Sequence, residues 1–357
     1  MQPFAGRAAV AGIGMTALSR QSGRTELELA VEACRAACAD AGIGPRDVDT
    51  MLSYHMNDSA SVVQVARALG IERLGWHNDI AGGGTQAASI LGDAAMLVHA
   101  GLARNILIFR ALNGRSGKRM NTVSTGPQER FTYGLAGPIP LFALAATRYL
   151  HDTGLTEEHL HAVVAQSRDN AKTNPRALRR EPLELADYLA RPYVCTPLRT
   201  VDCCQETDGA CALVVSGVLD GPRVQAVVRA GGPGCTSMDR SPDVSAIFST
   251  YVAPMLWEAS GMRPSDVDVA LPYDAYSWLV PRQVEDFGLV ERADLGAYLL
   301  ERRHAWVNPH GGLLSEGYVH GLNNVAQAVR ELRTGEGEVA LVTGFGGSYG
   351  SAALLTR

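Results

Sequence analysis

Three features of this sequence predict an α/β fold built as two successive halves. Short apolar runs typical of buried strands alternate with segments of helical periodicity. The alternation gives way at about residue 114 to a helical and loop-rich stretch, and it resumes after the break at Gly221-Pro222. At 357 residues the chain is long enough to bury a core in each half. We therefore predict an N-terminal half at 1–222, with an insertion at about 114–198, and a C-terminal half at 223–357.

The first half begins with a strand and an amphipathic helix, followed by further apolar runs of strand length. One helix of this half is apolar on nearly every face, which predicts a central, buried position. That helix is predicted at 85–101. The other elements expected here are a helix at 26–41 and strands at 8–14, 50–54, 76–80, 105–111 and 211–216.

The second half repeats the pattern of apolar strands separated by helices. The order strand, turn, helix occurs at 76–101 and again at 304–332, but the identity between the halves is too low to establish a duplication. The elements expected in this half are strands at 224–231, 267–272 and 339–344 and helices at 245–260 and 321–332.

Composition excludes several classes of function. The net charge is −5 and the charged residues are dispersed, which argues against a nucleic-acid partner. No secretion signal and no apolar run of about eighteen residues is evident, so we expect a cytoplasmic protein without a membrane span. Its seven cysteines are an odd number and lack zinc-site spacing, so we expect reduced thiols and no metal site.

Four glycine- or tyrosine-bearing segments carry the functional signal, and they follow one another in a fixed order. A segment rich in glycine, NPHGGLLSEGYVHG, spans 308–321. The others are AGGGTQA at 81–87, YDAY at 273–276 and GFGGSYG at 344–350. Two further segments lie between them: Asn174-Pro175, and CCQETDGA at 203–210.

These segments resemble the landmarks of the thiolase superfamily over nearly the whole chain. The resemblance implies an α/β fold of duplicated α-β-α-β-α layers with mixed five-stranded sheets. Ala81 stands where a thiolase has its acyl-accepting cysteine, and Tyr318 stands at the position of the catalytic histidine. Tyr273 replaces another polar catalytic residue, and Gly344 occupies the place of the acid/base cysteine.

Loss of both cysteines and the histidine resembles the steroid side-chain-cleaving aldolases of the lipid-transfer-protein type, as do the GYVHGLN motif and the segment at 110–119. That resemblance implies retro-aldol cleavage of a β-hydroxy acyl-CoA, namely a 17-hydroxy steroid C-20 carboxyl-CoA, to a ketone and a short acyl-CoA. Two alternatives stay open: aldol or other carbon–carbon bond formation on a different acyl-CoA, and a non-catalytic acyl-CoA or lipid-binding subunit. A displaced nucleophile at Cys203 or Cys204 is disfavoured, because that segment is a structural turn in the resembling families.

Retro-aldol cleavage needs an acid/base pair and an oxyanion site, and no covalent intermediate. The aldolase interpretation therefore adds the expectation that no organic cofactor is needed. We assign Tyr318 and Tyr273 as that pair, with the division of roles open and packing as the alternative for each. A phenol has a reference pKa of about 10, so its use as a base requires a neighbouring cation, hydrogen-bond donor or second phenol. His320 and His310 are candidates for this support, and Tyr276 or Tyr349 could share the role.

The glycine turns and one basic cluster are candidate binding elements. Backbone amides of Gly83 and Gly84 at a helix N-terminus, or of Gly346 and Gly347, can donate to a thioester oxygen. The same glycines could instead make room for a bulky fused-ring substrate, and both interpretations stay open. Arg115, Lys118 and Arg119 could pair with the phosphates of CoA, although a solvated loop explains them equally well.

The resemblance also implies partners. It predicts a homodimer formed through the core of the fold, together with a small zinc-ribbon/OB-fold partner protein. Any zinc would belong to that partner, because this chain lacks zinc-ribbon cysteine spacing.

Overall fold

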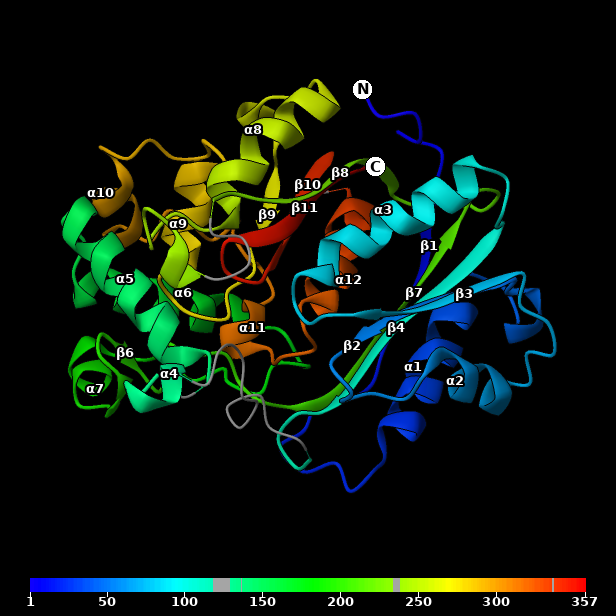
Figure 1. Ribbon diagram of the computed structural model, residues 1–357, viewed down its shortest axis with the longest axis horizontal. Coiled ribbons are helices and arrows are strands. Elements are labelled where there is room, and N and C mark those ends of the chain that lie inside the picture. Colours follow the sequence, from blue (N-terminus) through cyan, green and yellow to red (C-terminus); the bar gives the residue numbers. More distant parts are fainter. Residues whose placement is uncertain (118–128, 136, 234–237, 336) are drawn as a thin grey trace.

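Nine strands form one mixed sheet in the computed structural model, which describes residues 1–117, 129–135, 137–233, 238–335 and 337–357 (Figure 1). The order across the sheet is β3-β2-β4-β7-β1-β8-β11-β10-β9. The strands are β1 (Ala9–Met15), β2 (Thr50–His55), β3 (Trp76–Ala81), β4 (Asn105–Asn113), β7 (Asp208–Ser216), β8 (Arg223–Gly231), β9 (Val269–Leu271), β10 (Val339–Phe345) and β11 (Tyr349–Thr356). A separate two-stranded ribbon consists of β5 (Tyr193–Cys195) and β6 (Leu198–Arg199).

The sheet corrects one expectation and confirms another. Parallel pairs such as β2–β3 and β9–β10 coexist with antiparallel pairs such as β4–β7, so the predicted mixed character is confirmed. The prediction of separate five-stranded sheets is wrong, because nine strands form one continuous sheet. The strand β8 follows β7 after a short connection and lies on the free side of β1, where Ala9 pairs with Arg223. This pairing joins the strands of the two halves.

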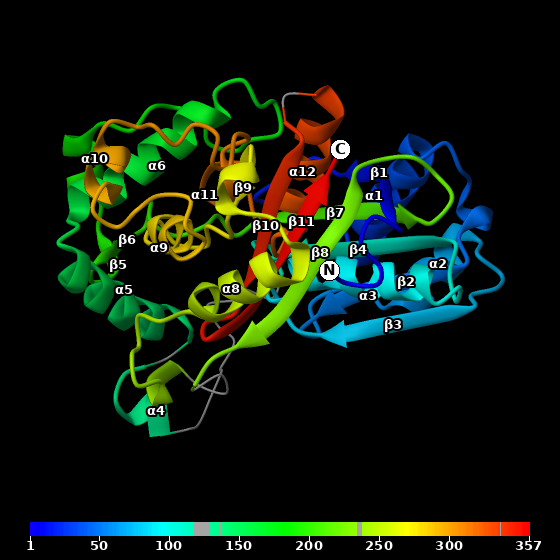
Figure 2. The same ribbon diagram turned by 90° about the horizontal axis from the view of Figure 1, so that it is seen from above.

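Helices lie on both outer faces and between the halves (Figures 1 and 2). The helices α1 (Glu26–Asp40) and α2 (Val62–Leu69) pack on the outer face of the N-terminal strands, and α8 (Phe248–Ser260) packs on β8 and β11. The helices α3 (Gln86–His99) and α12 (Leu322–Thr334) contact each other and strands of both halves. They form the buried central layer, which confirms the layered α/β architecture and the central position predicted for the apolar helix at 85–101.

The insertion packs onto the C-terminal half. It contains α4 (Glu129–Thr132), α5 (Ile139–Thr153), α6 (Glu157–Ala171) and α7 (Leu185–Leu189). The helix α6 contacts α10 (Leu295–Leu300) and α11 (Gly312–Ser315), while side chains of α5 share one apolar core with those of α9 (Leu279–Asp286). Figure 1 shows these helices together as one lobe beside the sheet. None of the helices that the structure describes is long and apolar enough to cross a membrane.

Candidate active site

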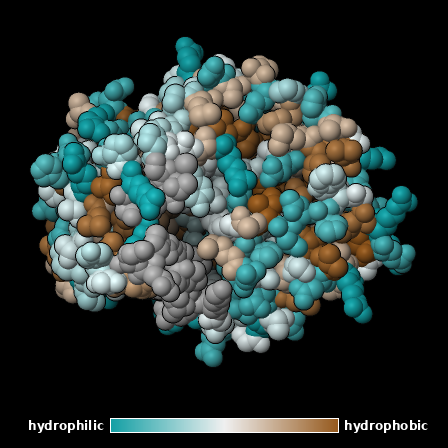
Figure 3. All heavy atoms as spheres, viewed as in Figure 1, coloured by the Kyte–Doolittle hydropathy of each residue, from teal (hydrophilic) through white to brown (hydrophobic). Residues whose placement is uncertain are grey.

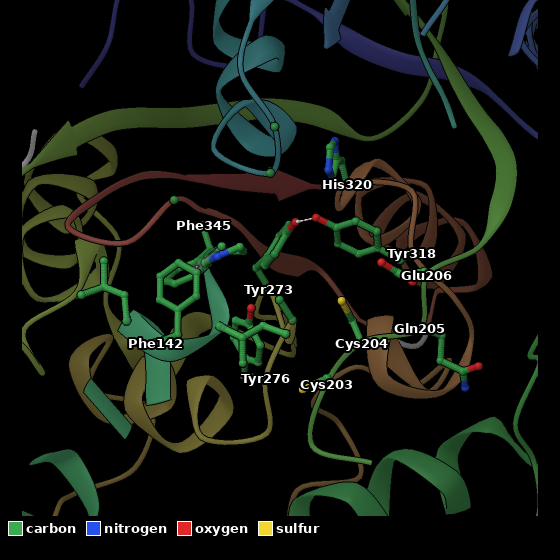
Figure 4. Close-up of a pocket in the computed structure, with 18 of the residues that line it drawn as sticks. Phe142, Cys203, Cys204, Gln205, Glu206, Tyr273, Tyr276, Tyr318, His320 and Phe345 are labelled. Carbon is green, nitrogen blue, oxygen red and sulfur yellow. Dashed lines mark hydrogen bonds between the residues drawn. The ribbon is translucent and has the colours of Figure 1, made fainter. Parts of the chain in front are cut away.

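A cavity of about 970 Å³ opens where the central helices, the insertion and the C-terminal strands meet. Its wall includes the turn before α3, the loop that bears Tyr318 and the end of β10 at Phe345. The insertion contributes Phe142 from α5, whose ring lies 5.2 Å from that of Tyr276 and 4.9 Å from that of Phe345. The insertion therefore forms part of the apolar wall. Figure 4 shows these rings on one side of Tyr273 and Gln205 on the other.

Tyr273 and Tyr318 meet in this cavity, although they are 45 residues apart in the chain. The Tyr273 hydroxyl donates to the Tyr318 hydroxyl with an oxygen–oxygen distance of 2.8 Å, and Figure 4 shows the two groups pointing toward one another. Burial raises the pKa of both phenols well above its ordinary value. The hydrogen bond from Tyr273 and the charge of Arg110 act in the opposite direction on the pKa of Tyr318. Both phenols are therefore protonated at neutral pH.

His320 is held by a buried ion pair that the sequence analysis missed. Arg110 Nε lies 3.1 Å and Arg110 Nη2 2.8 Å from His320 Nδ1, and Nη2 also contacts Asp58 Oδ2 at 2.7 Å. Arginine can only donate, so Nδ1 accepts and the proton of the neutral imidazole sits on Nε2. Burial and the charge of Arg110 lower the pKa of His320 to about 3. Arg110 is thus a cation that lowers the pKa of Tyr318, and His320 is neutral. The sequence signal for this ion pair was Arg110 itself, a charged residue within the apolar run of β4.

The buried, neutral state of His320 predicts an acid-dependent loss of stability. An unfolded histidine has a pKa of about 6.5, whereas His320 in the folded protein has a pKa of about 3. Below pH 6.5 His320 therefore binds a proton in the unfolded state and does not bind one in the folded state. We expect this group to remove about 2 kcal/mol from the free energy of unfolding between pH 8 and pH 5.

Urea unfolding at the two pH values tests this expectation with His320→Asn, since asparagine tolerates the positive φ of 47° at this position. The variant should lose about 2 kcal/mol less than the wild type on acidification. The exposed His99→Asn variant serves as the control and should parallel the wild type. Equal losses in His320→Asn and wild type would contradict the assignment.

The glycine turn before α3 makes room for Tyr273 and also presents unpaired amides. A Cβ on Gly84 would lie 2.2 Å from Tyr273 Oη, whereas one on Gly83 would lie 3.3 Å from Met56 Sδ and 3.4 Å from His320 Cε1. The amides of Gly83 and Gly84 donate to no described residue, and both glycines line the cavity at the α3 N-terminus. One turn can therefore both make room for a large group and offer backbone amides to a thioester oxygen.

Substitution of Gly84 tests the close packing against Tyr273. The Cβ of Gly84→Ala must displace the phenol, and a misplacement of about 1 Å is enough to cost about 100-fold in kcat. Gly83→Ala is the matched control, because its Cβ meets only side chains that can yield, and we expect a change of a few-fold. Steady-state kinetics together with circular dichroism separate catalytic loss from misfolding. Equal activity in the two variants would show that Gly84 does not position Tyr273.

The other glycine turn is divided between the cavity and the core. Gly346 lines the cavity, and a Cβ there would lie 2.0 Å from Thr85 Cγ2. Gly347 is not among the described lining residues; its carbonyl accepts from the Phe248 amide, and an added Cβ would meet Met238. Tyr349 lies at the exposed rim of the cavity.

His310 lies away from the cavity wall in a buried polar network. Its Nε2 lies 3.2 Å from Asn324 Oδ1 and 3.7 Å from Glu316 Oε2, and Glu316 also pairs with Arg176. Burial lowers the pKa of His310, and Glu316 opposes that shift. His310 thus braces the loop that carries Tyr318. Asp274 has a similar local role, because its carboxylate accepts from the Leu313 and Leu314 amides.

Cys203 and Cys204 line the cavity but are poor nucleophiles. Burial raises the pKa of the Cys203 thiol to about 12 and that of Cys204 well above its ordinary value. A thiol reacts as its thiolate, so neither is poised to accept an acyl group. The described residues also contain no cluster of three or more His, Cys, Asp or Glu able to hold a metal ion.

The predicted CoA-binding cluster is only partly described. Arg115 is exposed at the cavity rim, and its backbone amide donates to Asp208 Oδ1 at 3.1 Å. Lys118 and Arg119 lie outside the described residues. Arg168 of α6 and Arg179 also line the cavity, and no local sequence pattern had marked them.

Comparison with known proteins gives one consistent set of relatives. Residues 236–356 match the family model described as thiolase C-terminal domain-like. The chain is 36% identical to the 17-hydroxy-3-oxo-4-pregnene-20-carboxyl-CoA lyase of Mycobacterium tuberculosis, covering 92% of each chain. It is 36% identical to the steroid side-chain-cleaving aldolase of Thermomonospora curvata, covering 93% of this chain and 92% of the other. Among solved structures, the Ltp2-ChsH2(DUF35) aldolase superposes with a TM-score of 0.91 and 34% identity, over 100% of this chain and 99% of the other.

Proposed function

Because the chain is an aldolase of the thiolase superfamily and belongs to the steroid side-chain-cleaving aldolases, we propose that it cleaves the Cα–Cβ bond of a β-hydroxy acyl-CoA with Tyr273 and Tyr318 as its acid/base pair. The observation that carries the proposal is the 2.8 Å hydrogen bond between the two hydroxyls in a cavity whose thiols are protonated. The enzymatic class of the relatives argues against a non-catalytic subunit.

The proposed reaction moves one proton from the substrate hydroxyl to Cα. As the Cα–Cβ bond breaks, its electron pair becomes a thioester enolate and the hydroxyl carbon becomes a ketone. One phenol receives the hydroxyl proton and passes its own across the hydrogen bond, and the other phenol protonates Cα. This relay suits two phenols of raised pKa, because neither has to exist as a free phenolate. Hydroxyl groups rotate, so the pair can relay in either direction.

The turn before α3 would stabilise the enolate. Gly83 and Gly84 line the cavity at the N-terminus of a 14-residue helix, where the helix dipole favours negative charge. Amide donors of this kind, when preorganised, are a large contribution to catalysis in reactions that develop an oxyanion.

The apolar wall supports a bulky substrate, and we propose a 17-hydroxy steroid C-20 carboxyl-CoA. Phe142, Tyr276 and Phe345 form an aromatic surface beside the phenols. A cavity of about 970 Å³ lies at the upper end of the range of small-molecule sites. The name of the M. tuberculosis relative specifies the same substrate class.

The direct test is incubation of the purified protein with this steroid thioester, with release of the ketone and of the short acyl-CoA followed separately. Equimolar release of both products supports retro-aldol cleavage. Consumption of the ketone and the short acyl-CoA with net formation of the longer thioester would favour the forward aldol reaction. Release from a different β-hydroxy acyl-CoA alone would leave the chemistry in place and replace the substrate.

An exposed sheet edge supports the proposed homodimer. Within the described part of the chain, the strand β3 is the end strand of the sheet and pairs only with β2, so its outer backbone groups can pair with a second copy. Figure 3 shows hydrophobic residues over α3, and Met96 of α3 and Trp76 of β3 are exposed large side chains. Light scattering after size-exclusion chromatography should give twice the chain mass, and a monomer at micromolar concentration would contradict the proposal.

A small zinc-ribbon/OB-fold protein is the second proposed partner. The solved relative is named as a pairing of Ltp2 with ChsH2(DUF35). Co-purification of this chain with such a protein, and zinc that follows the small protein after separation, would support the assignment. Zinc that remains with this chain would contradict it.

A further inference from the structure

Both phenols of the proposed acid/base pair belong to connections between regular elements. Tyr273 lies between β9 and α9, and Tyr318 lies between α11 and α12. Connecting segments are generally more mobile than the helices and strands that they join. A tyrosine hydroxyl also lies at the far end of its side chain, so a small rotation of the backbone moves it a long way. The 2.8 Å contact between the two hydroxyls therefore needs support from outside these connections.

The backbone of Tyr273 is held at both of its polar groups by buried side chains. Its amide donates to Thr343 Oγ1 at 2.8 Å, and its carbonyl accepts from Gln283 Nε2 at 3.0 Å. The Thr343 hydroxyl donates in turn to Gln283 Oε1 at 2.6 Å, which closes a ring of hydrogen bonds. Thr343 belongs to β10 and Gln283 to α9, and both are buried. The ring thus ties Tyr273 to a strand and a helix of the core.

The backbone of Tyr318 is held by a single side chain that makes both bonds. Its amide donates to Thr207 Oγ1 at 3.0 Å, and its carbonyl accepts from the same hydroxyl at 2.8 Å. Thr207 is buried and directly precedes β7. A hydroxyl has one proton to donate, and Thr207 donates it to the Tyr318 carbonyl. A threonine at a strand therefore holds the backbone of each phenol, although the two threonines come from different halves of the chain.

These supporting side chains lie behind the cavity. Its described lining residues include both tyrosines but not Thr207, Thr343 or Gln283. Valine has nearly the shape of threonine and would fill the same space, so what each threonine hydroxyl adds is its hydrogen bonds. Any effect of these hydroxyls on the reaction must then pass through the tyrosines.

We propose that Thr207, Thr343 and Gln283 are positioning residues for the cleavage reaction, a role that rests on the proposed acid/base function of the phenols. They hold the backbones of Tyr318 and Tyr273 so that the two hydroxyls stay within reach for proton transfer. Such support has a large effect on rate, because a misplacement of about 1 Å can cost about 100-fold.

Thr207→Val and Thr343→Val test this role, since valine keeps the branched shape and lacks the hydroxyl. Each should lower kcat for the steroid CoA thioester by about 10- to 100-fold and change KM by less than about twofold. Thr207→Ser and Thr343→Ser keep the hydroxyl and should restore most of the activity. Circular dichroism and urea unfolding show which variants are folded.

Thr16→Val is the matched control for loss of a buried threonine hydroxyl. Thr16 is 2% exposed, and its Oγ1 accepts from the Ala210 amide at 2.9 Å. It is not among the described residues that line the cavity and bonds neither tyrosine. We expect Thr16→Val to lose stability in urea as the other two valine variants do, and to keep the wild-type kcat.

Hydrogen–deuterium exchange at single amides measures the same contacts without turnover. The Tyr318 amide should exchange about 2- to 10-fold faster in Thr207→Val, the range for one net hydrogen bond. The Tyr273 amide should respond in the same way to Thr343→Val. Thr16→Val should change neither rate.

Gln283→Met supplies a second variant on the Tyr273 side if Thr343→Val fails to fold. Methionine keeps an unbranched side chain of similar length and removes the donor to the Tyr273 carbonyl. It should lower kcat with KM unchanged, as the valine variants do.

The outcomes separate the positioning role from the reaction itself. Faster exchange at the two amides in a protein that does not cleave the thioester would retain the contacts and overturn the proposed activity. Cleavage with wild-type kcat in Thr207→Val, Thr343→Val and Gln283→Met would retain the activity and overturn the positioning role. A loss of kcat that serine does not restore, or one matched by Thr16→Val, would also overturn it, because packing alone would then explain the loss.

Discussion

Tyr318→Phe is expected to lower kcat for cleavage of the steroid CoA thioester by about 100- to 10,000-fold, with little change in KM. The substitution removes only the hydroxyl that bonds Tyr273, so the relay loses one of its two transfer groups while the ring keeps its edge-to-face contact with His320 at 4.9 Å. Steady-state kinetics on the folded variant measure the effect. Tyr273→Phe should be similarly impaired.

The double variant distinguishes a relay from two independent groups. Groups that act as one unit give non-additive losses, so Tyr273→Phe/Tyr318→Phe should be no slower than the worse single variant. Tyr149→Phe is the control for loss of a buried phenol, because its hydroxyl bonds Glu285 and does not line the cavity. Wild-type kcat in Tyr318→Phe would remove this tyrosine from the mechanism. A large loss of kcat in Tyr349→Phe, with wild-type kcat in the other variants, would assign the acid/base role to Tyr349 at the rim of the cavity.

Arg110→Met is expected to lower the free energy of unfolding by about 3–5 kcal/mol, since removal of one partner leaves a buried charge uncompensated. Arg110 is fully buried and Asp58 nearly so, and the guanidinium also bonds the Ala111 carbonyl and His320. Loss of the guanidinium leaves the Asp58 carboxylate without its ion-pair partner and His320 Nδ1 without a hydrogen-bond donor. Denaturant unfolding at pH 7.5 measures the change.

The matched surface pair is Arg333 with Asp40, which lies at the same 2.7 Å but is partly exposed. Arg333→Met should cost about 0–1 kcal/mol, as exposed ion pairs do. Replacing both buried partners, as in Arg110→Met/Asp58→Leu, should recover much of the loss because no charge remains unpaired. Equal destabilisation by Arg110→Met and Arg333→Met would contradict the account of the buried pair.

Elements whose burial follows from local pattern were predicted well from the sequence. The apolar runs at 50–54 and 105–111 are β2 and β4, and the helix at 26–41 is α1 with a Thr25 capping box. The elements β11 and α2 were missed. The strand β11 is stabilised by its antiparallel partners β8 and β10, and that pairing is a long-range property.

For the candidate site too, the sequence predicted some positions well and others poorly. Register against an ordered set of glycine and tyrosine motifs made Tyr273, Tyr318, Gly83 and Gly84 candidates, and the structure brings all four residues to one cavity. His310 was a candidate for supporting the phenols, yet it is not among the residues that line the cavity and instead contacts Asn324. Spacing along a loop does not determine which way a side chain points.

The sequence by itself determined the α/β class, the family landmarks and the absence of a cysteine at the thiolase nucleophile position, since these depend on residue type and local periodicity. Only the tertiary structure decided that the strands join into one nine-stranded sheet and that burial beside Arg110, which is paired with Asp58, keeps His320 neutral. These features depend on contacts between segments from 52 to more than 200 residues apart and on the desolvation that packing imposes.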